Sequence, residues 1–241
     1  GSYTVNTIEY GAFKDNNKIT SVKIPSTVTQ IGNSYGSGAF ENCANLKSVS
    51  IAAGAETAYI GNAAFKDCTS LEEITVPGNY TTIYSDAFRG CRSLKKFVYN
   101  DNGISRKIQN RAFYECTSLV SLSLPTSLNS IGDEAFSGCS SLTAVDIPEG
   151  VKLIEYGVFN NCKLLKKVVI PSTIQRIGNS YNTGAFQNCT SLSTVTIKEG
   201  SQAATIGSNT FSGCSAITSI VIPGNYSKVM DSAFKDCKGL K

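Results

Sequence analysis

The sequence predicts an α/β solenoid: stacked, similar turns with a parallel sheet on one face and short strands, turns or short helices on the other. Three observations predict it. A phrase built around Phe, with Cys three residues later and spaced aliphatic residues after it, occurs ten times in the 241 residues. Its copies lie 23 to 27 residues apart, and all six prolines fall at one place within it. The recurring phenylalanines are Phe13, Phe40, Phe65, Phe88, Phe113, Phe136, Phe159, Phe186, Phe211 and Phe234.

Each copy contains a segment with the pattern of a half-buried strand. In the copy that begins at Phe136, Val145 and Ile147 are apolar and alternate with polar neighbours, which indicates one buried face. Pro148 follows, and the strand must end there because proline has no N–H to donate to a sheet. Stacked copies place these strands side by side at about 4.8 Å per rung, so ten rungs make a body on the order of 45 Å long.

The remainder of each copy predicts a return path to the next rung. Val151 and Ile154 supply apolar side chains to the core from the return side. In several copies an Ile-Gly pair such as Ile131-Gly132 comes next, and its glycine indicates a bend at or near positive φ. A short helical or irregular turn then carries the Ala-Phe pair. The ten phenylalanines should therefore form one inner ladder, while Phe97 lies in a strand slot.

The combination Leu-x-x-Val-x-Ile-Pro, Ile-Gly and Ala-Phe-x-x-Cys resembles the BspA-like bacterial leucine-rich repeats, from about Thr7 to the end of the chain. Asn16 departs from the pattern at the first Cys, and Ala52, Asn100 and Lys198 depart at the Pro. The resemblance implies a right-handed superhelix that is secreted or attached to a cell surface. It also implies binding to host matrix proteins or to other cells.

A longer period is superposed on the repeat. Residues 24–43 and 170–189 are identical at 14 of 20 positions, 146 residues or six repeats apart. A block of several repeats was therefore duplicated together with its loop insertions. We expect residues 1–241 to form a single solenoid of about ten repeats, cut from a longer array because the last copy stops in mid-phrase. Gly1-Ser2 resembles a remnant of cloning.

Nine cysteines occupy the position three residues after Phe, and three interpretations compete. A metal site needs converging ligands, whereas these thiols follow one another along a row, one per rung. Disulfides between rungs would need Cβ atoms nearer to each other than parallel side chains one rung apart allow. A ladder of buried free thiols that pack as small apolar groups is the interpretation we favour. The cysteines are Cys43, Cys68, Cys91, Cys116, Cys139, Cys162, Cys189, Cys214 and Cys237.

Composition argues against several functions. The chain has no His, which excludes Ser-His-Asp and Cys-His catalysis, and no phosphate-binding loop or calcium loop occurs. We therefore expect neither a cofactor nor enzymatic activity. The net charge of +4 is too small to indicate nucleic acid, and no apolar run approaches the roughly 18 residues of a membrane span.

Two features indicate binding. The segment from Arg89 to Arg111 carries seven cations against one carboxylate, and part of its pattern recurs three repeats later, which predicts a basic patch for an acidic or sulfated glycan or an acidic protein surface. Two loop insertions carry tyrosine among Asn, Ser and Gly, which is typical of an adaptable contact surface. The candidate ligand-binding residues are Arg92, Lys95, Lys96, Arg106, Lys107, Lys166, Lys167, Tyr35 and Tyr181.

Function in a solenoid lies on its exposed sheet face and in its insertions. The predicted outward strand positions are small and polar, such as Ser48 and Ser50. We expect an extracellular binding or adhesion module whose partner is a host matrix or cell-surface protein or a glycan. The alternative is a passive spacer, and an enzyme domain is the third class. The exposure of the tyrosines and the clustering of the cations separate the first two.

Overall fold

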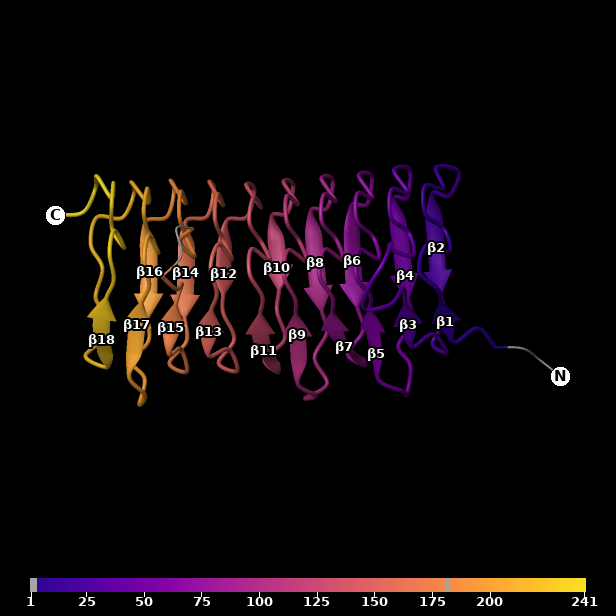
Figure 1. Cartoon of the computed structure of the whole chain (residues 1–241), viewed down its shortest axis with the longest axis horizontal. Coiled ribbons are helices and arrows are strands. Elements are labelled where there is room, and N and C mark those ends of the chain that lie inside the picture. The colour runs from indigo at the N-terminus through magenta and orange to yellow at the C-terminus, as the bar shows by residue number, and fades with distance from the viewer. Residues whose placement is uncertain (1–3, 181–182) are drawn as a thin grey trace.

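The computed structural model describes residues 4–180 and 183–241 and shows an elongated stack of rungs with the termini at opposite ends (Figure 1). The described residues form strands and turns without a helix, so the return side consists of short strands and turns. All strand pairs are parallel.

The strands that precede the prolines form one side of each rung, as predicted. They lie in register, with Val22 opposite Val49 and Ile24 opposite Ile51. The predicted outward residues, such as Ser48 and Ser50, are exposed. The row is divided into a five-stranded sheet of β2 (Ser21–Ile24), β4 (Ser48–Ile51), β6 (Glu73–Val76), β8 (Lys96–Tyr99) and β10 (Ser121–Ser123), and a three-stranded sheet of β12 (Ala144–Asp146), β14 (Lys167–Ile170) and β16 (Thr194–Ile197). The strand pattern in each copy also predicts a strand ahead of Pro223, and this is wrong: the backbone of residues 219–221 is not paired as a strand.

A continuous ten-stranded sheet forms the other side of the rungs, which is more order than the sequence predicted. The strands are β1 (Thr7–Ile8), β3 (Gln30–Ile31), β5 (Ala58–Ile60), β7 (Tyr80–Ile83), β9 (Arg106–Ile108), β11 (Leu128–Ile131), β13 (Leu153–Ile154), β15 (Arg176–Ile177), β17 (Ala204–Ile206) and β18 (Tyr226–Val229). The strands of this sheet from β3 to β17 end in buried isoleucines, and Ile31 pairs with Ile60, whereas the last strand ends in the exposed Val229.

Turns join the two sides with little freedom. The carbonyl of Pro148 accepts a hydrogen bond from the N–H of Val151 at 3.1 Å, so proline both ends the strand and starts the turn. Gly32 has the expected positive φ of 75°, which suits glycine. The same expectation is wrong at Gly61, Gly132 and Gly207, where glycine is needed for another reason: an added Cβ would collide with a neighbouring rung, and at Gly61 it would lie 2.5 Å from the carbonyl oxygen of Asn33.

The phenylalanine ladder is confirmed. From Phe13 to Phe234, each ring stacks on the next with centroids 4.9 to 5.5 Å apart and planes within 14° of parallel. Phe97 packs at a tilt against Phe88 and Phe113 from its strand slot. Most of these rings are fully buried, and they fill the centre of every rung.

The cysteines are free and buried, as the favoured interpretation predicted. They also do something that the sequence did not indicate. Each thiol donates a hydrogen bond to the Phe carbonyl of the preceding rung, as Cys139 does to Phe113 at 3.3 Å. All nine sulfur-to-oxygen distances lie between 3.0 and 3.3 Å. The thiol therefore fills space and satisfies a carbonyl in the rung before it.

The residue before each cysteine has a left-handed backbone. This slot, which precedes Asn16 in the first copy, has φ between 57° and 76° in all ten copies, and short or flexible residues fill it except at Glu115. Asn, Asp and Gly accept this conformation readily, whereas other side chains do so at a cost. The ten residues are Asp15, Asn42, Asp67, Gly90, Glu115, Gly138, Asn161, Asn188, Gly213 and Asp236.

Candidate binding face

The predicted basic patch is largely compensated by acidic side chains. Lys95 pairs with Glu72 at 3.0 Å, one rung earlier, and Arg92 pairs with Glu115 at 3.4 Å, one rung later. Arg89, Arg106 and Arg111 also have carboxylate partners. Such exposed pairs stabilise the fold only slightly, but they cancel the charge that a ligand would meet. Five of the seven cations of the segment 89–111 are therefore paired.

Arg106 is not a surface residue, which corrects its assignment as a ligand contact. Its side chain is fully buried, and in the adjacent strand β11 it stands opposite the buried Leu128. The guanidinium contacts Asp101 at 3.1 Å, the Ile104 carbonyl at 2.6 Å, the Ser127 hydroxyl and the Gly78 carbonyl. It ties together the loop that follows β8. A ligand on the surface cannot reach it.

The remaining predicted lysines are exposed but dispersed. Lys96 begins β8 in the five-stranded sheet, whereas Lys107 lies in β9 of the ten-stranded sheet. Lys167 begins β14 and Lys166 directly precedes it, three rungs from Lys96 and in a separate sheet. Lys96 also stands directly across from Glu73 on β6. The structure thus brings these cations together in no single patch.

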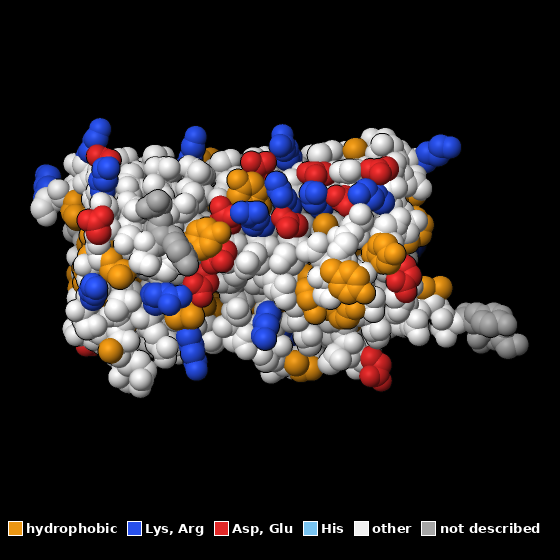
Figure 2. Space-filling view, viewed as in Figure 1, with side chains coloured by type: hydrophobic (Ala, Val, Ile, Leu, Met, Phe, Trp, Pro, Cys, Tyr) orange, Lys and Arg blue, Asp and Glu red, His pale blue; other side chains and the backbone are white. Residues whose placement is uncertain are grey.

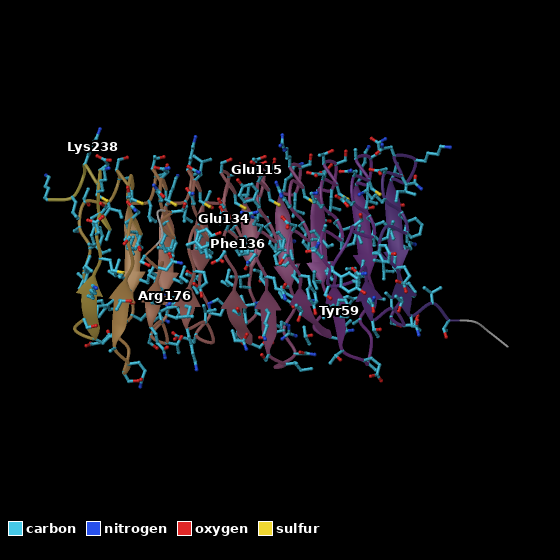
Figure 3. All side chains as sticks on the ribbon, in the orientation of Figure 1. Tyr59, Glu115, Glu134, Phe136, Arg176 and Lys238 are labelled. Carbon is cyan, nitrogen blue, oxygen red and sulfur yellow. The ribbon has the colours of Figure 1, made fainter. Side chains whose placement is uncertain are left out.

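Tyrosines gather where one insertion loop meets the ten-stranded sheet. Tyr35, in the loop of residues 33–37, is 73% exposed, and Tyr10 is 57% exposed. Tyr59 on β5 and Tyr84 just after β7 make an edge contact, with centroids 5.3 Å apart and planes at 63°. We call Tyr10, Tyr35, Tyr59 and Tyr84 the tyrosine cluster. Figure 2 shows hydrophobic side chains gathered there, where Figure 3 labels Tyr59.

Other tyrosines behave differently. Tyr80 is buried, and its hydroxyl donates to the carbonyl of Val28 at 3.1 Å, so it belongs to the core rather than to an exposed turn. Burial raises the pKa of Tyr80 to about 12. The equivalent of Tyr35 in the duplicated block is Tyr181, and this predicted contact lies outside the described residues.

The insertion loop that presents Tyr35 is held by its own hydrogen bonds. The side chain of Asn33 accepts from the N–H of Tyr35 at 3.1 Å. The side chain of Asn62, one rung on, donates to the carbonyl of Gly36 at 3.2 Å. A Cβ on Gly36 would lie 3.9 Å from the Tyr10 ring, so the loop passes close to that ring. These contacts position the aromatic rings before any ligand arrives.

A polar hollow adjoins the tyrosine cluster along the same face. The N–H of Asp86, two residues after Tyr84, donates to the carbonyl of Asn110 at 3.0 Å, so the two features occupy adjacent rungs. Figure 2 shows acidic and basic side chains side by side at its far end, where Figure 3 labels Arg176. The hollow has a volume of about 560 Å³ and is lined by Asn110, Ser130, Ile131, Gly132, Asp133, Glu155, Tyr156, Arg176, Asn179 and Ser180.

Two carboxylates in and beside the hollow form ion pairs, whereas the carboxyl of Asp133 lies among other acidic groups. Glu155 pairs with Arg176 at 2.8 Å, and Glu134 beside the hollow pairs with Arg111 at 2.7 Å. Burial, with added repulsion from Glu155 and Glu134, raises the pKa of Asp133 above its usual value. In the part of the chain that the structure describes, no group of three or more His, Cys, Asp or Glu side chains is arranged to hold a metal ion. The same residues include no helix able to cross a membrane.

Comparison with known proteins identifies the repeat. The family model for the BspA type leucine rich repeat region matches residues 2–105 and 106–241. The chain belongs to the BspA-type leucine-rich repeat family. The resemblance read from the phrase is thereby confirmed. No curated protein matches the chain.

Solved structures agree with this fold. The *T. pallidum* leucine-rich repeat protein is 26% identical, with 88% of this chain and 82% of that chain covered and a TM-score of 0.63. A leucine-rich repeat protein from *Bacteroides ovatus* is 25% identical, with 99% and 82% covered and a TM-score of 0.59. A leucine rich cell surface protein from *Faecalibacterium prausnitzii* is 26% identical, with 99% and 76% covered, but its TM-score of 0.47 is too low to inform on this chain.

Sequence reasoning missed much of this face in the BspA-type chain. It named Tyr35 but not Tyr10 or Tyr84, because their gathering depends on which residues face outward from adjacent rungs. It also missed the pairing of the cations, although the signal was present. Glu72 and Lys95 lie 23 residues apart, as do Arg92 and Glu115, and 23 residues is one period of the repeat.

Proposed function

We propose that this BspA-type solenoid is a non-enzymatic binding module that contacts a protein partner outside or on the surface of a bacterial cell. Its contact surface is the face formed by the tyrosine cluster and the polar hollow. The observation that carries the proposal is the gathering of four tyrosines beside an insertion loop, of which Tyr10 and Tyr35 are exposed and the other two half-buried. Tyrosine and arginine are the side chains that dominate protein interfaces, and this face offers both.

The rest of the surface is a weaker candidate. Small polar residues such as Ser121 and Ser123 line the outer face of the proline-side strands. Among the described residues, this face has no exposed Tyr or Arg that could anchor a partner. The paired cations of the segment 89–111 leave little net charge to attract a sulfated glycan. A protein partner therefore fits the molecule better than an acidic polysaccharide does.

The test compares two surfaces of one protein. The purified chain is applied to an array of matrix proteins, cell-surface proteins and glycans, and each ligand found is titrated against two matched double variants. Y35S/Y59S removes two rings from the tyrosine cluster, and K96S/K167S removes two exposed cations elsewhere. We expect the first to weaken binding about tenfold or more and the second to change it less than about twofold. Loss in the lysine variant alone would assign binding to the other sheets, and an array without any ligand would favour the spacer.

A further inference from the structure

The tyrosine cluster has the composition and geometry of a site for an organic cation. Tyr59 and Tyr84 stand at 63° to one another, so their ring faces form two walls of a corner rather than one flat platform. These two rings are half-buried, and Tyr35 and Tyr10 add two exposed rings from the insertion loop and from the first rung. The face of an aromatic ring is electron-rich and attracts an ammonium or guanidinium group within about 6 Å.

A carboxylate supplies the complementary charge. Glu9, next to Tyr10, is exposed and has no ion-pair partner among the described residues. It lies near enough to Tyr59 that burial, Tyr84 and Glu9 together raise the pKa of the Tyr59 phenol. The tyrosines are therefore held beside a negative charge that forms no ion pair with any of the described residues.

The cations near the cluster do not fill this role. The Lys14 ammonium donates to the Ser37 hydroxyl of the insertion loop at 3.1 Å, but it is paired with Glu41 at 3.1 Å. Lys107 on β9 lies two strands from Tyr59 on β5, which is about 10 Å away at the usual strand spacing. Physiological salt screens charges over about 8 Å, so Lys107 and Glu9 act on each other only weakly. A cation brought by a ligand would meet Glu9 and the ring faces directly.

We propose that Tyr10, Tyr35, Tyr59 and Tyr84, with Glu9, bind the ammonium group of a lysine side chain presented by the partner protein. The proposal rests on the proposed function for the identity of the ligand, but the site can be tested without a partner. It also reverses the polarity of ligand that the basic segment of the sequence suggested. The cations of the basic segment are neutralised by carboxylates and attract an acidic ligand only weakly. The unpaired Glu9 and the ring faces instead favour a basic ligand.

The test uses a lysine derivative and its neutral counterpart. Nα-acetyl-lysine methylamide and the same compound acetylated on Nε are titrated into the protein while the tyrosine ring signals are followed by NMR. We expect the charged compound to shift the signals of Tyr59 and Tyr84 with a Kd in the millimolar range. The acetylated compound should bind about five to thirty times more weakly, because it keeps the shape and loses the charge.

Matched variants separate the ring from the hydroxyl and from the carboxylate. Y59F keeps the aromatic face and should bind the charged compound within about twofold of the parent, whereas Y59L and E9Q should each weaken it about threefold or more. Circular dichroism confirms that each variant is folded. Equal binding of both compounds, or unmoved ring signals at about 100 mM, would overturn the cation site. The array experiment is independent, so a partner lost in Y35S/Y59S would still support the binding face if the lysine compound failed.

Discussion

We predict that the buried thiols make the stability of this solenoid fall steeply in alkali. Burial raises the pKa of all nine cysteines; for Cys214 the hydrogen bond with Cys189 is the larger cause. In the unfolded chain a thiol ionises near pH 8.5. A folded-state pKa above the unfolded value means that the contribution to stability is complete below about pH 8.5 and is lost as pH rises towards the folded-state pKa.

The size of the effect follows from the number of rungs. If the described rungs unfold together, unfolding above about pH 9 releases close to one proton per thiol, or nine in all. The free energy of unfolding then falls on the order of 10 kcal/mol per pH unit. A net stability of about 5–15 kcal/mol is exhausted within one to two pH units of the thiol pKa. If rungs unfold singly, each loses only its own thiol, and the slope is roughly nine times smaller.

The assay is urea unfolding followed by circular dichroism, under reducing and oxygen-free conditions, at steps from about pH 7 to about pH 10.5. Thiolate absorbance is recorded alongside. We expect a flat free energy of unfolding up to about pH 8, then a steep fall, with thiolate appearing only as the protein unfolds. The variant C116A/C139A/C162A lacks three of the nine thiols, so its slope should fall by about a third even if its stability at neutral pH is lower. A free energy that stays constant to about pH 10, or thiolate formed while the fold is intact, would refute the reasoning.

Three further predictions concern single side chains. R106A leaves the buried partners of the guanidinium unsatisfied and opens a cavity, so the free energy of unfolding in urea should fall by about 3–5 kcal/mol. R106M should lower it less, because methionine fills part of the cavity. A fall of less than about 1 kcal/mol for R106A would contradict the structural role of Arg106. Glu115 has a left-handed φ of 57°, a conformation that Asn adopts at less cost than Glu. E115N should therefore raise the free energy of unfolding by about 1 kcal/mol despite losing the ion pair with Arg92. A net loss of stability would show that the ion pair outweighs the backbone strain. D133N should raise Tm at pH 7, because ionised Asp133 opposes folding there, and the gain should vanish below about pH 4, where both states are protonated; a gain that is constant with pH would rule out this electrostatic cause.

The sequence predicted the parts of the fold that repeat. Ten copies of one slot are enough to assign Phe136 to an inner ladder and Cys139 to the core. A side chain that recurs at a fixed offset packs against the equivalent side chain of the next rung when the rungs stack. Pro148 likewise marked the end of a strand. These inferences need only the period and the polarity of each position.

Contacts between rungs were harder to predict. The hydrogen bond from Cys139 to Phe113 depends on the height of one rung relative to the next, which no single copy displays. Arg106 carries the residue type of a surface site but stands two residues before a buried isoleucine, where the adjacent strand has Leu128. Its burial depends on Asp101, on the Gly78 carbonyl of the preceding rung and on the Ser127 hydroxyl of the following rung, and composition gives no sign of them. The face formed by the tyrosine cluster and the polar hollow could not be predicted from the sequence for the same reason, because it also depends on contacts between rungs.

The duplicated insertions set a length on the molecule. The loop that begins at Asn33 and the loop that begins at Asn179 are six rungs apart, or about 29 Å at the usual spacing of parallel strands. Parallel stacking fixes that interval, since a rung cannot slip by one residue without turning its core side chains outward. A ligand that touches both loops must present matching features at the same interval. The rungs therefore fix the distance between the two loops, and adding or deleting one rung between them would change that distance by about 5 Å.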